Sequence, residues 1–173
     1  GPFRLLAPIG QGGMGEVWRG LHEVQGVYVA IKVITGGRAR DPRYLGAFRN
    51  EVRAMAGLDH PGIVRLYDFG EVPAAPPPEL GLPGGSPYLV MELVEGGSLS
   101  RQQQGLPWES LVRVLRSVLD ALAHAHDRGI VHRDMKPDNI VVSHTPEGGD
   151  LVKVLDFGLA RVRLPEISHL TRS

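Results

Sequence analysis

The first half of the chain alternates between short apolar stretches and turns rich in glycine. Residues 5–9, 16–21 and 27–34 are rich in Val, Ile, Leu, Trp and Tyr, and glycines separate them. This pattern predicts antiparallel strands joined by turns. Residues 63–69 and 88–93 predict two further strands. Between them, the Pro- and Gly-rich segment 73–87 is expected to form an exposed, variable and partly disordered loop.

Two segments have the periodicity of helices. Asp41 followed by Pro42 is a helix-start signal, and this helix is expected to end at about Ala56, before Gly57. On it, Glu51 shares a face with apolar residues. Residues 107–128 carry a second helical pattern of apolar positions.

The pattern changes near residues 95–98, which include a pair of glycines. We therefore predict an α+β fold of two lobes. Residues 1–94 form an antiparallel sheet with one helix, and residues 95–173 form a helix followed by short strands and loops.

Composition narrows the function only slightly. The 173 residues are 42% hydrophobic and 22% charged, which is typical of a globular chain. Lys and Arg together number 19, as do Asp and Glu, so nothing favours nucleic acid or an anionic membrane as a partner. Cysteine is absent, which excludes disulfides and thiolate metal sites.

The compartment is inferred from targeting signals. The sequence has no long apolar run and no signal peptide, so a cytoplasmic location is the default expectation, although the parent protein could have a membrane anchor elsewhere. The chain does not begin with Met and is expected to be a fragment of a longer protein.

Gly10, Gly12 and Gly15 form the pattern G-x-G-x-x-G. In a dinucleotide-binding fold a helix would follow, whereas here a strand-like stretch follows. A glycine hairpin of this kind can cover phosphates, because glycines leave backbone amides accessible. An ordinary glycine-rich hairpin is the alternative.

Lys32 lies in VAIK, where Val29 and Ile31 are expected to face one side of a strand and Ala30 and Lys32 the other. An isolated lysine there is normally exposed. A buried carboxylate and a buried ammonium each need a partner, however, so we predict a Lys32–Glu51 ion pair that holds the lysine against ligand phosphates.

The stretch VHRDMKPDNI concentrates charge between apolar segments, and LDFGLA follows with Asp156. Asn139 and Asp156 are oxygen ligands that suit Mg²⁺ bound together with substrate phosphates. Asp134 is the candidate to accept a proton from a hydroxyl, and Lys136 to neutralise a phosphoryl group. A loop with an Asx turn is the alternative for Asp134 and Asn139 alone.

Taken in order, GQGGMGEV, VAIK, HRDMKPDN and DFG resemble the signature set of protein kinase catalytic domains. GQGGMGEVW and Lys136 are most similar to the eukaryotic-like Ser/Thr kinases of bacteria. The resemblance covers residues 3–173. It implies a two-lobed kinase fold, ATP with Mg²⁺ or Mn²⁺, transfer of the γ-phosphoryl group, and proteins with Ser or Thr as substrates.

The resemblance also assigns roles to single residues. Asp134 is the implied base, Lys136 and Lys32 contact phosphates, and Asn139 and Asp156 hold the metal. Met91 resembles the residue that gates the back pocket, and residues 92–94, the hinge segment, resemble the stretch whose backbone binds adenine. The implied nucleotide site consists of Ile9, Gly10, Gly12, Gly15, Val17, Ala30, Lys32, Glu51, Met91, Glu92, Val94, Asn139, Val141 and Asp156.

Two further features follow from the resemblance. An apolar stack that links the lobes of active kinases is implied for His132, Phe157, Met55 and Leu66. Arg133 implies control by phosphorylation of the activation loop, whose hydroxyls here are Ser168, Thr171 and Ser173. A flexible tail with incidental hydroxyls is the alternative for these residues.

The chain is expected to be truncated within the activation loop, because the A-P-E segment and the helices that bind protein substrates in this family do not follow. The helix at 107–128 is therefore expected to expose an apolar patch. Two other functions stay open: a nucleotide-binding, pseudokinase-like module without turnover, and a small-molecule phosphotransferase related to antibiotic kinases. The sequence leaves the substrate, the upstream signal and the oligomeric state undetermined.

Overall fold

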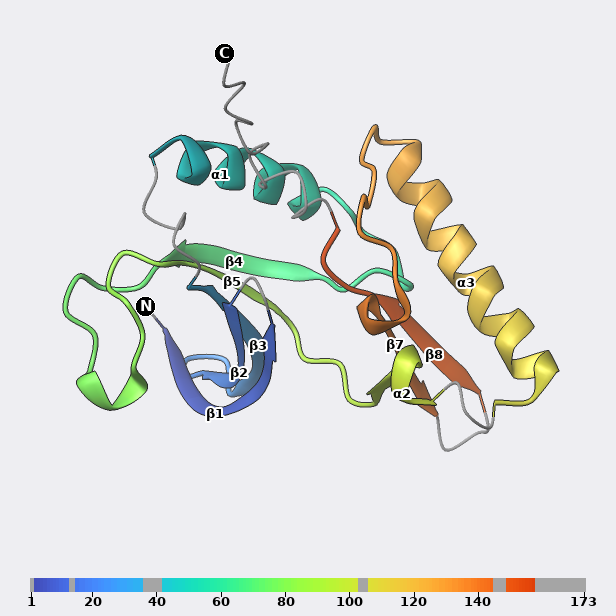
Figure 1. Cartoon of the computed structure of the whole chain (residues 1–173), viewed down its shortest axis with the longest axis horizontal. Helices are drawn as coiled ribbons and strands as arrows, with labels where there is room; N and C mark the ends of the chain where they lie inside the picture. The colour runs from blue at the N-terminus through green and yellow to red at the C-terminus, as the bar shows by residue number, and fades with distance from the viewer. Residues whose placement is uncertain (1, 13–14, 36–41, 103–105, 145–148, 158–173) are drawn as a thin grey trace, which may run out of the picture.

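The structure is a computed structural model that describes residues 2–12, 15–35, 42–102, 106–144 and 149–157. The elements form two groups that lie side by side along the long axis of the molecule (Figure 1). The N-lobe is a sheet with helix α1, and the C-lobe is a smaller sheet with helices α2 and α3. The predicted two-lobed α+β architecture is therefore confirmed.

The N-lobe sheet has five antiparallel strands in the order β1-β2-β3-β5-β4. These are β1 Phe3–Gly12, β2 Gly15–His22, β3 Val27–Ile34, β4 Leu66–Glu71 and β5 Pro87–Glu92. The sequence predicted all five strands, but the predicted first strand, residues 5–9, is shorter than β1. The glycine segment itself stays in the ladder, with Gly10 opposite Val17 and Gly12 opposite Gly15.

Strand β3 is the centre of the N-lobe core because both of its faces are covered. Val29 and Ile31 belong to a buried cluster on one face, and Ala30 belongs to a second cluster on the other. Helix α1, Pro42–Ala56, covers this second face with Phe48 and Val52. The predicted helix is thus confirmed, while its expected N-cap, Asp41, lies outside the described residues.

The Pro- and Gly-rich segment 73–87 partly covers the first face of the sheet. Leu82 is buried there, in one cluster with Val72 and Ile31. The base of the segment is closed by backbone hydrogen bonds, since Gly85 N–H donates to Val72 O and Val72 N–H donates to Ser86 O. The expected exposed, partly disordered loop is therefore wrong for Leu82 and Ser86, which are both buried.

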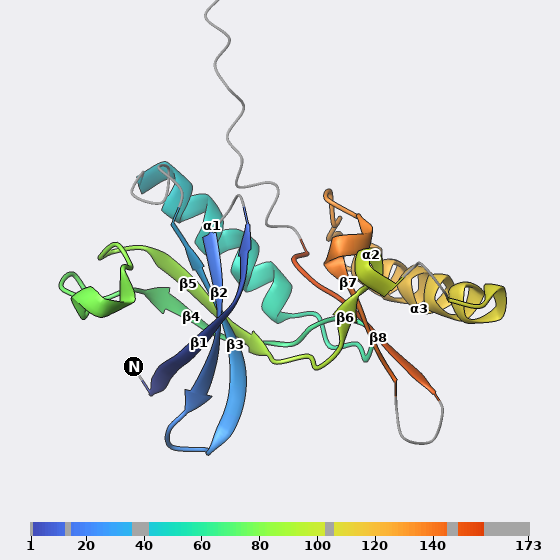
Figure 2. The same cartoon turned by 60° about the horizontal axis from the view of Figure 1, so that its bottom comes forward.

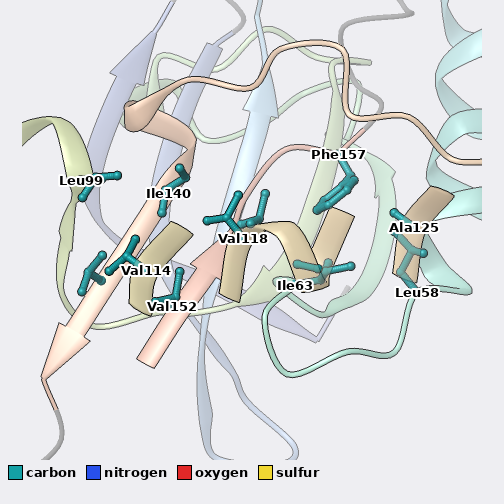
Figure 3. Packing of buried hydrophobic residues seen from close by; sticks show 12 residues of the cluster. Leu58, Ile63, Leu99, Val114, Val118, Ala125, Ile140, Val152 and Phe157 are labelled. Atoms are coloured by element: carbon teal, nitrogen blue, oxygen red, sulfur yellow. The ribbon is translucent and has the colours of Figure 1, made fainter. Parts of the chain in front are cut away.

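In the C-lobe, the strands β6 Gly97–Ser98, β7 Ile140–His144 and β8 Asp150–Val154 form a three-stranded sheet. Helix α2, Leu99–Gln102, is short, and the long α3, Trp108–His126, follows the predicted helix within two residues at each end. Figure 3 shows how α3 packs, with Val114 and Val118 among Ile140 and Val152 of the sheet.

The connection from α1 to β4 crosses to the C-lobe and returns (Figures 1 and 2). There, Ile63 forms a parallel bridge with Val154, Val64 N–H donates to Val154 O, and Val154 N–H donates to Gly62 O. Ile63 is buried in the C-lobe core. The predicted strand 63–69 is therefore wrong in its first residues, because the N-lobe strand starts only at Leu66.

Helix α3 also carries an exposed apolar stripe, as expected for residues 107–128. The stripe consists of side chains spaced three or four residues apart that are 41% to 70% exposed: Trp108, Val112, Leu115 and Leu119. None of the described helices is both long and apolar enough to cross a membrane.

Candidate active site

Lys32 enters the site from β3, on the face that carries Ala30. Its side chain is 10% exposed, and its Nζ lies 2.5 Å from Oδ2 of Asp156. The predicted pair with Glu51 is not what the described residues show. Asp156 lies two residues after the end of β8 and brings its carboxylate to Lys32, so this ammonium has a different partner.

Glu51 lies 3.9 Å from Arg133, measured from Oε1 to Nη1. Its side chain is 14% exposed, on the helix face that also buries Phe48 and Val52. A carboxylate in this environment is costly without a cation. The prediction that Glu51 faces inwards is confirmed, but the cation it meets is Arg133 and not Lys32.

Asp134, Lys136 and Asn139 form one hydrogen-bonded group in the loop after α3. Asn139 is buried, and its Nδ2 donates to the backbone oxygen of Asp134 at 2.7 Å and to Oδ2 of Asp134 at 3.4 Å. Lys136 Nζ lies 3.1 Å from the same Oδ2. The backbone oxygen of Asn139 accepts from Leu155 N–H, which ties this loop to the residue before Asp156.

The buried side chain of His132 holds the same loop in place with two hydrogen bonds. Its Nε2 donates to Leu155 O at 2.7 Å, and its Nδ1 accepts from Asp134 N–H at 3.2 Å. Burial lowers the pKa of His132, which favours the neutral ring that this pair of bonds requires. The backbone of Asp134 is therefore positioned by a neutral histidine.

The predicted apolar stack comes together around Phe157. The ring of Phe157 meets the ring of His132 edge to face, with 4.7 Å between the centroids. Met55 and Leu66 line the same small cavity as Phe157. All four residues thus lie in one region between the lobes.

The glycine hairpin shows why one of its glycines is required. Gly15 has a φ of 142°, and a Cβ there would lie 1.9 Å from the carbonyl oxygen of Val33. No side chain fits this position. The neighbouring Gly10 and Gly12 belong to the β1–β2 ladder, as described above.

Three of the apolar residues expected around adenine lie in one cluster of the N-lobe. Ala30 and Met91 are neighbours on β3 and β5, and Val17 packs against their cluster. Ile9 is 51% exposed on β1. Val94, two residues after the end of β5, and Val141 on β7 are both half-buried.

Two site residues have a strained backbone. Arg133 has a φ of 65° and Asp156 a φ of 58°, and within the described residues no other non-glycine residue has a positive φ. Such conformations cost about 1 to 3 kcal/mol and are typical of functional sites. Both residues belong to the ion pairs that replace the predicted Lys32–Glu51 pair.

Comparison with known proteins gives the family. A family model described as a protein kinase domain matches residues 3–170. The chain belongs to the protein kinase family. Among its relatives, serine/threonine-protein kinase Pkn1 of Myxococcus xanthus is 42% identical over 164 residues, and PknL of Mycobacterium tuberculosis is 42% identical over 162 residues. The crystal structure of the M. tuberculosis PknI kinase domain is similar, with a TM-score of 0.73 at 27% identity.

The kinase domain matches only part of each relative. The alignments cover 94% of this chain and 22% of Pkn1, and 92% of this chain and 37% of PknL. The comparison with PknI covers 91% of this chain and 60% of the PknI chain. The chain therefore spans less than two thirds of the length of each.

The sequence reasoning missed one charged residue of the kinase domain. Lys153 on β8 is buried and lies 2.8 Å from Glu92 at the start of the hinge segment, measured from Nζ to Oε2. A signal was present, because Lys153 stands in the apolar run LVKVL as Lys32 stands in VAIKVI. A lysine within a buried strand indicates an acidic partner. The proposed phosphorylation sites Ser168, Thr171 and Ser173 lie outside the described residues.

Proposed function

We propose that the protein containing this kinase domain transfers the γ-phosphoryl group of ATP to serine and threonine hydroxyls of other proteins. The observation that carries this proposal is a connected group of side chains from distant parts of the sequence. Lys32 contacts Asp156, the adjacent Leu155 bonds to Asn139, and Asn139 bonds to Asp134. The similarity to Ser/Thr kinases of bacteria supports this function.

The residues fit the roles that such a transfer requires. Asp134 accepts the proton of the attacking hydroxyl, and Lys136 beside it offsets charge on the phosphoryl group. Lys32 supplies a buried cation for the other phosphates of the nucleotide. These groups act by position and charge, which is how most of the rate of phosphoryl transfer arises.

The site also fits ATP with Mg²⁺ or Mn²⁺. Asp156 offers a carboxylate, and Asn139 uses its amide nitrogen, not its oxygen, in its bonds to Asp134. A carboxylate and an amide oxygen are the hard ligands these cations prefer, and the bound cation would neutralise phosphate charge. The hairpin with Gly15 would lie over the phosphates, and the hinge segment would bind the adenine edge.

The test uses the complete protein that contains this chain, labelled ATP and a generic protein substrate. Asp134→Asn is expected to lower the transfer rate by about 10² to 10⁴, because it removes the base but keeps the size of the side chain. Asp138→Asn is the matched control. Asp138 lies in the same loop but accepts a hydrogen bond from Ser100, so its loss should leave the rate close to that of the wild type.

Three results would contradict the proposal. Equal rates for Asp134→Asn and the wild type would show that Asp134 is not the base. Binding of ATP with Mg²⁺, seen as a rise in melting temperature without labelled product, would favour a nucleotide-binding module without turnover. Labelling of aminoglycosides in preference to proteins would instead indicate a small-molecule phosphotransferase.

A further inference from the structure

The last three residues of strand β8 are all buried. Val152, Lys153 and Val154 are 5%, 8% and 0% exposed. Val152 and Val154 belong to the C-lobe core with α3, and since side chains alternate along a strand, Lys153 points away from that core. A lysine at such a position requires a partner, because burying an unpaired ammonium is expensive.

The partner belongs to the other lobe. Lys153 Nζ lies 2.8 Å from Oε2 of Glu92 and 3.5 Å from the carbonyl oxygen of Ile63. The side chains of Lys153 and Glu92 are 10% and 27% exposed, so water screens their attraction only in part. By contrast, the neighbouring Arg65–Asp59 pair is largely exposed, with side chains 59% and 82% accessible, and contributes little.

Glu92 is held at three points. Its Oε2 accepts from Lys153 and, at 3.2 Å, from Arg65 N–H, while its own N–H donates to Arg65 O at 2.8 Å. It is the last residue of β5, opposite Val29 of β3, and the chain leaves the sheet directly after it. The carboxylate of Glu92 therefore fixes the point at which the hinge segment begins.

Lys153 also links the start of the hinge segment to Asp156. It stands three residues before Asp156 on the same stretch of chain, and Asp156 contacts Lys32. One partly buried ion pair thus links the start of the hinge segment to the stretch of chain that carries Asp156, the carboxylate expected at the phosphates.

We propose that Lys153 is a positioning residue for nucleotide binding. By pairing with Glu92, it sets the hinge segment in the geometry that receives the adenine of ATP while Asp156 faces the phosphates. This inference rests on the proposed function, because it takes ATP as the ligand. In this proposal, Lys153 acts through Glu92 and does not contact the nucleotide.

The experiment compares Lys153→Met with two controls in the complete protein. Lys153→Arg keeps the cation, and Asp59→Asn removes the exposed pair from the same surface depression. Two quantities are measured: the Kd for ATP in the folded protein, and the rate of amide hydrogen exchange of residues 92–96 without nucleotide. Lys153→Met should raise the Kd about tenfold and speed the exchange, while both controls stay within about twofold of the wild type.

A purely structural role gives a different result. Lys153→Met would then lower the melting temperature but leave the Kd and the exchange of residues 92–96 unchanged in the folded protein, and this outcome would overturn the proposal. Should Lys153→Met not fold, Glu92→Gln keeps the size and an oxygen acceptor, and we expect it to raise the Kd about threefold. No change in Kd for Glu92→Gln would equally contradict the proposal.

Different measurements test the kinase reaction and the role of Lys153. Absence of phosphoryl transfer in the wild type would contradict the kinase reaction, whereas faster exchange in Lys153→Met would still support the positioning of the hinge segment. Exchange is measured without nucleotide, so it does not depend on catalysis.

Discussion

Lys32→Met tests which carboxylate this lysine stabilises before nucleotide binds. In the structure, Nζ of Lys32 is 2.5 Å from Asp156, while Glu51 lies beside Arg133. Without nucleotide, the free energy of unfolding should therefore show coupling between Lys32 and Asp156. It should show little coupling between Lys32 and Glu51.

The structure sets the size of the effect. A hydrogen bond to a charged group typically contributes about 1.5 to 3 kcal/mol. The side chains of Lys32 and Asp156 are 10% and 24% exposed, so solvent weakens their attraction only in part. We expect a coupling energy of about 2 kcal/mol for this pair, and less than about 0.5 kcal/mol for Lys32 with Glu51.

The assay is urea unfolding without nucleotide or metal, analysed as two double-mutant cycles. The first cycle combines Lys32→Met with Asp156→Asn, and the second combines Lys32→Met with Glu51→Gln. Both acid-to-amide changes keep the size of the side chain, so the cycles differ only in which carboxylate is neutralised.

A larger coupling with Glu51 than with Asp156 would refute the reasoning. It would mean that the predicted Lys32–Glu51 pair forms in solution without nucleotide. Equal and small couplings would show that neither contact contributes measurably to the free energy of unfolding. In that case, water stabilises the ammonium of Lys32.

Three further outcomes are expected. Gly15→Ala should lower the free energy of unfolding by at least about 2 kcal/mol, because its Cβ would meet the Val33 carbonyl group, whereas Gly26→Ala, with positive φ but open space, should cost about 1 kcal/mol in the same urea titration. Replacing Leu115 and Leu119, which are 45% and 66% exposed on α3, by Gln should reduce self-association in light scattering and change stability by less than about 0.5 kcal/mol each. Burial lowers the pKa of His132 in the folded protein, whereas in the unfolded chain this pKa is about 6.5. As the pH falls, the unfolded chain therefore binds more protons than the folded protein does. The free energy of unfolding should fall as the pH is lowered from about 7 to 5, and it should fall less steeply in His132→Phe. An unchanged light-scattering signal, or an identical pH slope in His132→Phe, would contradict the corresponding prediction.

Much of the fold could be predicted because its elements have local signals. Glycine turns separate the strands, and Pro42 marks the start of α1. The break after Ile63 had no local signal, since residues 63–69 are continuously strand-like and the partner of Ile63, Val154, lies far along the chain. The burial of Leu82 likewise depends on a sheet face that composition alone does not reveal.

The site could be predicted in its residues but not in its contacts. Both Glu51 and Asp156 are acidic groups suited to pair with Lys32, and the choice depends on how α1 and the end of β8 are placed relative to β3. That placement is a property of the packed lobes. Lys153 had only a weak signal, its place in an apolar run, because its partner Glu92 lies 61 residues away in the sequence.

The double crossing between the lobes has a mechanical consequence. Residues 57–65 leave the N-lobe, bind to Val154 and return, and the chain leaves the N-lobe again through the hinge segment after Glu92. Two attachment points define a line, so the easiest relative motion of the lobes is a hinge rotation about that line. Sliding or twisting would have to break the backbone bonds at Val154. These two attachments thus favour opening and closing over other relative motions of the lobes.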